Sequence, residues 1–328
     1  MSAHMPLALT CGDPSGIGPE LAARVVKSAP APFFWIGDPR HLPADTPWQA
    51  ITAPAETAQV PRGVLPVLTL DFAAEATPGQ PDPANAAGTV AAIERAVRLV
   101  QAGEASAVVT APINKKALKD GAGFAFPGHT EFLADLAGGC DVVMMLACAA
   151  LRVVPATIHI PLKDVPQALT REGLETVIRT THAALIRDFG LSKPQIAVAG
   201  LNPHAGEGGA MGDEELTLIT PLLDDLRAEG FALSGPLPAD TMFHASARAR
   251  YDAAICMYHD QALIPIKTID FAGGVNVTLG LPFVRTSPDH GTAYDIAGRG
   301  IADPTSLRAA MVMAWDMAER RASGGTNA

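Results

Sequence analysis

The chain has 328 residues, which is enough to bury a large core, and we expect two domains. Its residues are 48% hydrophobic but only 5% aromatic, with 30 Gly and 28 Pro, a composition typical of α/β proteins and not of coiled coils or all-β sandwiches. The net charge of −10 argues against general binding to nucleic acid or to anionic membranes.

Short strands alternate with helical patterns along the whole chain. We expect strands at 7–10, 33–36, 107–110, 142–147, 153–160, 195–199 and 253–257. We expect helices at 19–27, 89–101, 132–136, 174–188, 214–229 and 306–320. Residues 81–88 are expected to form a loop. This alternation predicts mostly parallel sheets, with functional loops at the carboxyl ends of the strands.

The cysteines and the apolar runs predict a soluble, cytoplasmic protein with no membrane partner. The four cysteines lie far apart without a C-x-x-C pair, so we expect buried thiols and no disulfide framework. No basic-then-apolar leader opens the chain, and no apolar run approaches the length of a membrane span.

Three histidines follow predicted strands. His159 lies at the end of 153–160, while His204 and His259 come just after the next two strands. Because the carboxyl ends of parallel strands meet in one crevice, these imidazoles could hold one divalent cation with a position open to substrate. Such a site should weaken below about pH 6.5, since neutral imidazole is the ligating form. Each histidine alone is better explained as an ordinary polar residue.

A second group of residues indicates an anion site. His129 and Thr130 precede a predicted helix, where side-chain donors and free backbone N–H groups suit a phosphate or carboxylate; a helix cap at Thr130 is the alternative. Lys267, Asn276 and Arg285 are lone polar residues in apolar surroundings. A bound anion would explain the two cations, and structural salt bridges are the alternative.

Two segments near strand ends have less specific patterns. Residues 12–20 (GDPSGIGPE) are similar to a nucleotide-binding loop but lack the P-loop ending and the G-x-G-x-x-G spacing. We therefore predict a tight turn and a helix start, with Pro19 near the first helical position. Residues 111–116 (APINKK) could line a cleft with two lysines or begin a solvated helix.

The most distinctive segment is the polar loop at 287–304, SPDHGTAYDIAGRGIADP. Glycine lets a backbone approach a flat ligand closely. The carboxylate of Asp295 can accept both hydroxyls of a ribose and would repel the extra phosphate of NADP, so the loop favours NAD. A surface loop with a cap at Asp303 or Ser306 is the alternative. The residues expected to contact the cofactor are His290, Gly291, Thr292 and Asp295.

These motifs together resemble the 4-hydroxythreonine-4-phosphate dehydrogenase family of vitamin B6 biosynthesis. The matching blocks, in order, are 12–20, 110–115, 127–131, 201–207, 235–241, 257–261, 280–286 and 289–300. The resemblance implies NAD-dependent oxidation of 4-phosphooxy-L-threonine at C3. The resulting 3-keto acid would decarboxylate to 3-amino-2-oxopropyl phosphate, a step toward pyridoxal 5'-phosphate.

The resemblance also implies an architecture, because the loop is similar to the adenosine-binding loop of isocitrate and isopropylmalate dehydrogenases. It implies two α/β/α domains, with mostly parallel sheets and an active-site cleft between them. We place the first domain at 1–130 plus 286–328 and the second at 131–285. It further implies a homodimer whose active site is shared across the interface.

The resemblance assigns a role to each candidate residue. His159, His204 and His259 would hold a divalent metal, with one ligand from the partner chain; zinc is the first choice, and cobalt or magnesium are alternatives. Asp240 would lie near the site as a candidate proton acceptor. The implied substrate contacts are His129, Thr130, Lys267, Asn276 and Arg285.

Three other functions fit part of these observations. A paralogous dehydrogenase of another phosphorylated hydroxy acid, such as a tetronate 4-phosphate, would have very similar anion and metal sites. A metal-dependent hydrolase would use the histidines to activate water but leaves the loop 289–300 unexplained. A non-catalytic metal-binding protein leaves the anion-holding residues without a purpose.

Overall fold

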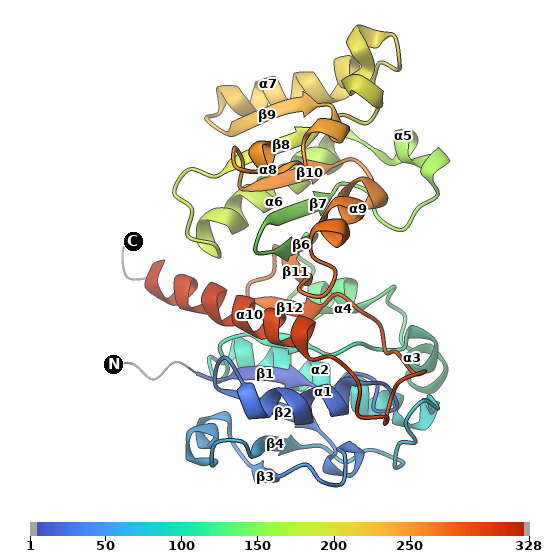
Figure 1. Cartoon of the computed structure of the whole chain (residues 1–328), viewed down its shortest axis with the longest axis vertical. Helices are drawn as coiled ribbons and strands as arrows, with labels where there is room; N and C mark the ends of the chain where they lie inside the picture. The colour runs from blue at the N-terminus through green and yellow to red at the C-terminus, as the bar shows by residue number, and fades with distance from the viewer. Residues whose placement is uncertain (1–4, 325–328) are drawn as a thin grey trace. The chain divides into compact units, whose positions relative to one another are not determined.

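Strands and helices alternate along the computed structural model, which describes residues 5–324 (Figure 1). The chain divides into two compact units. Residues 141–280 form unit 2, and the described residues on either side of them form unit 1. Both units combine a sheet with helices, so the predicted α/β class is confirmed.

The sheet of unit 1 is parallel throughout. Its strand order is β3-β4-β2-β1-β5-β12, and each neighbouring pair runs in the same direction. The strands are β1 (Leu7–Thr10), β2 (Phe33–Gly37), β3 (Trp48–Ile51), β4 (Leu65–Thr69), β5 (Val108–Thr110) and β12 (Arg285–Pro288). Trp35 and Ile36 of β2 are fully buried, as expected for a parallel sheet covered on both faces.

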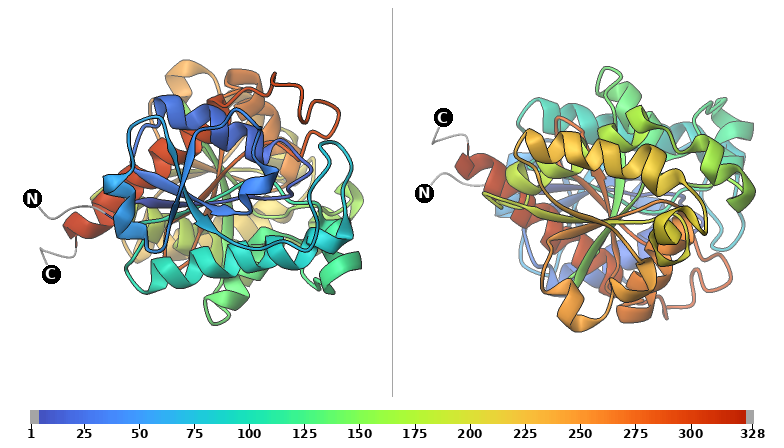
Figure 2. Two further views of the ribbon diagram at one scale, coloured as in Figure 1. Left: turned by 90° about the horizontal axis from the view of Figure 1, so that it is seen from below. Right: turned by 90° about the horizontal axis from the view of Figure 1, so that it is seen from above.

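Helices cover both faces of this sheet. They are α1 (Gly18–Val25), α2 (Ala86–Gln101), α3 (Lys115–Ala122), α4 (His129–Leu136) and α10 (Thr305–Gly324). Helix α2 packs on β1 and β2, whereas α10 packs on β12, β5 and β1. The left view of Figure 2 shows α1 and α2 on opposite faces of the strands, so unit 1 has α/β/α layers.

Unit 2 has a mixed sheet in the order β11-β6-β7-β10-β8-β9. Its strands are β6 (Val143–Cys148), β7 (Leu151–Pro155), β8 (Gln195–Ala199), β9 (Ala232–Leu237), β10 (Ala253–Cys256) and β11 (Val275–Leu279). Strands β7, β10, β8 and β9 are mutually parallel, while β6 runs antiparallel to both of its neighbours. The prediction of mostly parallel sheets is confirmed, with β6 as the exception.

Helices also flank the sheet of unit 2. They are α5 (Val165–Ala168), α6 (Arg171–Arg187), a π-helical turn (Glu215–Ile219), α7 (Thr220–Ala228), α8 (Ala245–Arg248) and α9 (His259–Ile269). Helix α6 packs on β6 and β11, and α9 packs on β7 and β10. The right view of Figure 2 shows α7 and the orange helices on opposite faces of the strands.

Several predicted bounds are corrected by the structure. The strand expected at 153–160 ends at Pro155, so His159 lies in the following loop. Helix α2 begins at Ala86, inside the region expected to be a loop. Helix α9 was missed because Pro265 interrupts its pattern, and β12 because Arg-Thr-Ser-Pro is not an apolar run.

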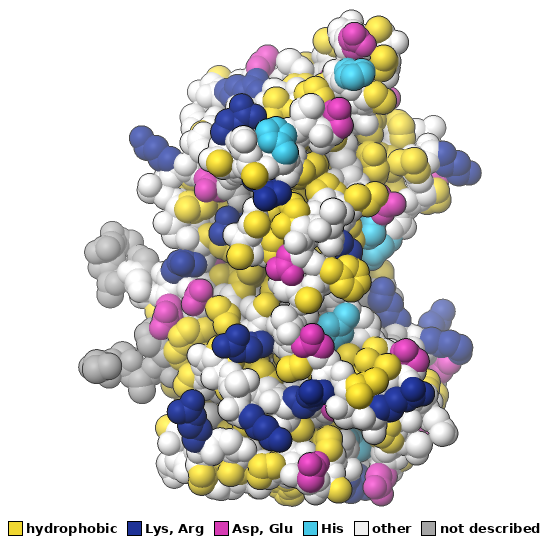
Figure 3. Space-filling view, in the orientation of Figure 1, with side chains coloured by type: hydrophobic (Ala, Val, Ile, Leu, Met, Phe, Trp, Pro, Cys, Tyr) yellow, Lys and Arg dark blue, Asp and Glu magenta, His cyan; other side chains and the backbone are white. Residues whose placement is uncertain are grey.

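The surface and the cysteines can be compared with the expectations from composition. No helix within residues 5–324 is both long and apolar enough to cross a membrane. Basic and acidic side chains are interspersed on the face drawn in Figure 3. The four cysteines carry free thiols, as predicted, and burial raises the pKa of the Cys11 thiol to about 12.

Replacing Ile93 with Ala should destabilise unit 1. Ile93 is fully buried on α2, so the cavity should lower the free energy of unfolding by about 2–5 kcal/mol. The neighbouring Glu94→Ala removes only a long surface ion pair with Arg98 (3.7 Å) and should cost no more than about 1 kcal/mol. Chemical denaturation of both variants measures this difference; equal losses would contradict the packing described for α2.

Candidate functional site

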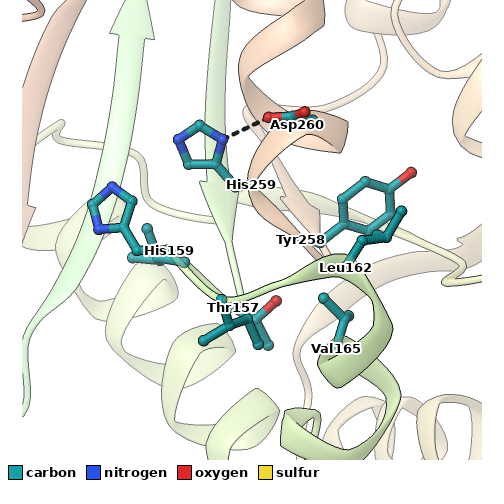
Figure 4. Close-up of a pocket in the computed structure, with 9 residues that line it drawn as sticks. Thr157, His159, Leu162, Val165, Tyr258, His259 and Asp260 are labelled. Atoms are coloured by element: carbon teal, nitrogen blue, oxygen red, sulfur yellow. Dashed lines mark hydrogen bonds and ion pairs between the residues drawn. The ribbon is translucent and has the colours of Figure 1, made fainter.

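A pocket in unit 2 contains two of the three predicted metal ligands (Figure 4). His159 comes from the loop after β7, and His259 is the first residue of α9. Their ring centroids lie 5.6 Å apart. The residues that line the pocket are Thr157, Ile158, His159, Ile160, Leu162, Val165, Tyr258, His259 and Asp260.

The pairing of β7 with β10 brings these two histidines together. The strands are parallel neighbours, and the contact continues beyond their ends. The Ala156 N–H donates to the Cys256 carbonyl at 2.7 Å, and the Thr157 hydroxyl donates to the Met257 carbonyl at 2.7 Å. His159 then adopts a left-handed backbone conformation, with φ +51°, which is costly for a non-glycine residue and often marks a functional position.

The ring of His259 is oriented by its neighbour. Its Nδ1 donates to the Asp260 carboxylate at 2.7 Å, as the dashed line in Figure 4 shows. A carboxylate on one ring nitrogen leaves the other nitrogen, Nε2, to act as a ligand and makes it more basic. The donor chemistry of His159 and His259 therefore suits a divalent cation such as zinc.

His204 lies outside this pocket, in the exposed turn Pro203–Gly209 after β8. Residues 204–209 all have positive φ, and the turn is tied back through Asn202, whose N–H donates to the Glu215 carboxylate at 2.7 Å. Within the described residues of one chain, no three His, Cys, Asp or Glu side chains are close enough to hold a metal.

A cationic site lies in unit 1, where the side chain of Arg285, the first residue of β12, reaches Thr110, the last residue of β5. Arg285 is 3% exposed, and its Nε and Nη2 donate to the Thr110 hydroxyl at 3.2 and 2.6 Å. Burial lowers the pKa of Arg285 to about 10, so the guanidinium remains charged near neutral pH. Thr110 was not selected from the sequence; a polar residue ending a buried parallel strand is the signal that could have identified it.

His129, the first residue of α4, contributes a ring nitrogen to this site. Its Nε2 is buried and has no hydrogen-bond partner among residues 5–324. Burial and the positive charges of Arg285 and Lys115 lower the pKa of His129 well below its usual range, so the ring is neutral. A buried polar atom without a partner beside a cation fits a bound anion. The helix cap is Gly128, not Thr130.

The remaining predicted substrate residues belong to unit 2. Lys267 lies in the last turn of α9, with its ammonium 5.3 Å from the Phe271 ring centroid. Asn276 is on β11, and its Oδ1 is buried with no hydrogen-bond partner in the part of the chain described. Asp240 is exposed in the short helix Ala239–Thr241.

The predicted cofactor loop follows β12 and packs on the glycine-rich turn. The Ile17 N–H donates to the Thr292 carbonyl at 3.0 Å. Asp295 is exposed, while the Nε2 of His290 is buried without a partner among the described residues, as a ligand-binding loop would leave it. The predicted tight turn and helix start at 12–20 are confirmed, because Gly12 has φ +69° and Pro19 is the second residue of α1.

Comparisons with known proteins give one consistent result. The 4-hydroxythreonine-4-phosphate dehydrogenase of Paracoccus denitrificans is 63% identical over 98% of this chain and 100% of its own length, and that of Ruegeria sp. is 62% identical over 96% and 97%. The solved 4-hydroxythreonine-4-phosphate dehydrogenase of Klebsiella pneumoniae is 38% identical, with a TM-score of 0.87 over 96% of this chain and 99% of that one. The family model described as pyridoxal phosphate biosynthetic protein PdxA matches residues 30–314. The chain therefore belongs to the PdxA family.

Proposed function

We propose that this chain oxidises 4-phosphooxy-L-threonine at C3 with NAD and releases CO2 to give 3-amino-2-oxopropyl phosphate, a step of pyridoxal 5'-phosphate biosynthesis. The near full-length identity to enzymes of that name supports this activity. The structural observation that carries it is the buried Arg285, whose charge acts on His129, together with the buried Nε2 of His129, which has no hydrogen-bond partner among residues 5–324; the pair suits an anionic substrate.

The chain's own residues would hold the anionic ends of the substrate. Thr110 fixes the guanidinium of Arg285, so a phosphate or carboxylate would meet a charged group that is already oriented. The neutral ring of His129 would contribute one hydrogen bond from its buried nitrogen. Thr130, Lys267 and Asn276 remain proposed substrate contacts.

We also propose a metal site shared between two subunits of a cytoplasmic homodimer. His159 and His259 of one chain would be joined by His204 of the partner subunit, because the first two meet in one pocket and His204 does not line it. The strained, exposed turn at 204–209 supports a functional role for His204.

Metal and cofactor would supply the chemistry that these side chains lack. When bound, the cation would ease removal of the C3 hydroxyl proton, and NAD would accept the hydride. Asp240 is retained as a proposed proton acceptor. The 3-keto acid would then lose its carboxylate as CO2, the electrons of the broken C–C bond would form an enolate with the new ketone, and the former C2 would take up a proton to give 3-amino-2-oxopropyl phosphate. Imidazole ligands favour zinc, with cobalt or magnesium as alternatives.

The proposed reaction can be tested by NADH formation from 4-phosphooxy-L-threonine. We expect activity that falls at least about 100-fold on chelation and returns with added zinc or cobalt. A tetronate 4-phosphate serves as the competing substrate. Turnover of the tetronate alone would identify a paralogous dehydrogenase, and turnover without nicotinamide would identify a hydrolase.

The shared metal site predicts complementation between inactive variants. A mixed dimer of one His204→Ala and one His259→Ala subunit should keep one of its two sites intact. Random exchange of subunits makes about half of the dimers mixed, so about a quarter of wild-type activity should return. The matched control mixes His159→Ala with His259→Ala, which damages both sites of every mixed dimer. Activity and metal content are measured together. Restoration in neither mixture, or in both, would contradict the proposed ligand set.

Replacing Asp295 with Ala should change cofactor choice. The exposed carboxylate would repel the 2'-phosphate of NADP, so its loss should reduce the preference for NAD by roughly 10-fold. Steady-state kinetics with both cofactors measure this ratio. Asp45→Ala, which removes an exposed carboxylate outside the loop, is the control. An unchanged ratio in Asp295→Ala would show that the loop was misinterpreted.

A further inference from the structure

In unit 1, the side chain of Tyr294 connects three chain segments through hydrogen bonds. The proposed reaction does not assign a role to these contacts. Tyr294 lies in the middle of the loop 289–300, and its hydroxyl donates to Oδ2 of Asp13 at 2.6 Å. The same hydroxyl accepts a hydrogen bond from Nδ2 of Asn114 at 2.7 Å. Asp13 belongs to the glycine-rich turn after β1, and Asn114 lies in the segment after β5.

Both partners of Tyr294 are also fixed to the backbone. The second carboxylate oxygen of Asp13 accepts the Ser15 N–H at 2.8 Å, and Asp13 is 6% exposed. The amide oxygen of Asn114 accepts the Ala117 N–H at 3.1 Å and caps helix α3. Neither side chain can turn away from Tyr294 without losing another bond. Burial, followed by the hydrogen bond to Asp13, raises the pKa of Tyr294 to about 12, so the phenol keeps its proton.

The backbones of these segments pack closely around the same hydroxyl. The Gly79 N–H donates to the Ser15 carbonyl at 2.7 Å. A Cβ at Gly16 would lie 2.9 Å from the Thr292 carbonyl oxygen, and a Cβ at Gly79 would lie 2.9 Å from that of Tyr294. Only glycine permits these approaches, so Gly16 lets the loop rest directly on the turn, and Gly79 lets a further segment pack against both.

We propose that Tyr294, Asp13 and Asn114 are positioning residues that hold the loop 289–300 in the shape that binds NAD. Tyr294 stands between Thr292 and Asp295, so a rotation of the loop there would displace both proposed cofactor contacts. A loop that is ordered before binding loses less conformational entropy when the ligand arrives. This inference rests on the proposed function of the loop in NAD binding. It assigns to the glycine-rich turn the role of stabilising the loop conformation.

The test compares Tyr294→Phe, Asp13→Ala and the double variant. NAD affinity is measured by calorimetry without substrate, and amide hydrogen exchange is measured across residues 291–297. Each single variant should bind NAD about 10-fold more weakly, with faster exchange, nearly unchanged kcat and an unchanged KM for the phosphorylated substrate. The double variant should bind NAD less weakly than the sum of the two single losses requires, because both substitutions break the hydrogen bond between these two side chains.

Tyr251→Phe is the matched control. Its hydroxyl donates to the Met242 carbonyl at 2.9 Å in unit 2, so its loss should leave NAD affinity and loop exchange unchanged. Wild-type affinity and exchange in Tyr294→Phe, or losses that add in the double variant, would overturn the positioning role. A wild-type protein that binds no NAD would overturn the cofactor assignment instead, and exchange at 291–297 alone would then decide whether Tyr294 orders the loop.

Discussion

Parallel strand pairing is the constraint on which both candidate sites depend. In unit 1, β1, β5 and β12 are parallel neighbours, so the segments that follow them emerge at one edge of the sheet. This is why the turn with Asp13, the segment with Asn114 and the loop with Tyr294 can share one hydroxyl group. In unit 2, the pairing of β7 with β10 brings His159 beside His259 in the same way.

The α/β architecture and the family could be predicted from the sequence, but the backbone conformation of every loop could not. The helix predicted at 89–101 has clear periodicity and lies within α2, and the motifs identified the family. Three histidines were expected to meet because each follows a strand. His204 does not join the pocket, since the turn after β8 winds through left-handed conformations and is tied to Glu215. No periodic pattern encodes such a turn, because hydrogen bonds and backbone angles determine it.

The cationic site shows how a protein of net charge −10 can still hold a buried positive charge. The position of an individual charge matters more than the net charge of the protein. Arg285 is buried and hydrogen-bonded to Thr110, whereas most other charged side chains face solvent, where their fields are screened. Burial, together with the positive charges of Arg285 and Lys115, lowers the pKa of His129 well below its usual range and keeps the ring neutral. Arg285 was selected from its apolar surroundings, but its partner Thr110 was not, since the pairing of β5 with β12 joins positions 175 residues apart.

The metal site proposed to be shared between two subunits would have a consequence for how the protein acquires a metal. Two imidazoles hold a divalent ion less firmly than three, so an isolated subunit would exchange its cation with the medium. If the third imidazole comes from a second copy, mass action links metal occupancy to protein concentration. Dilution would then cause loss of the metal and dissociation of the dimer at the same time. The supply of metal would therefore control dimer formation as well as catalysis.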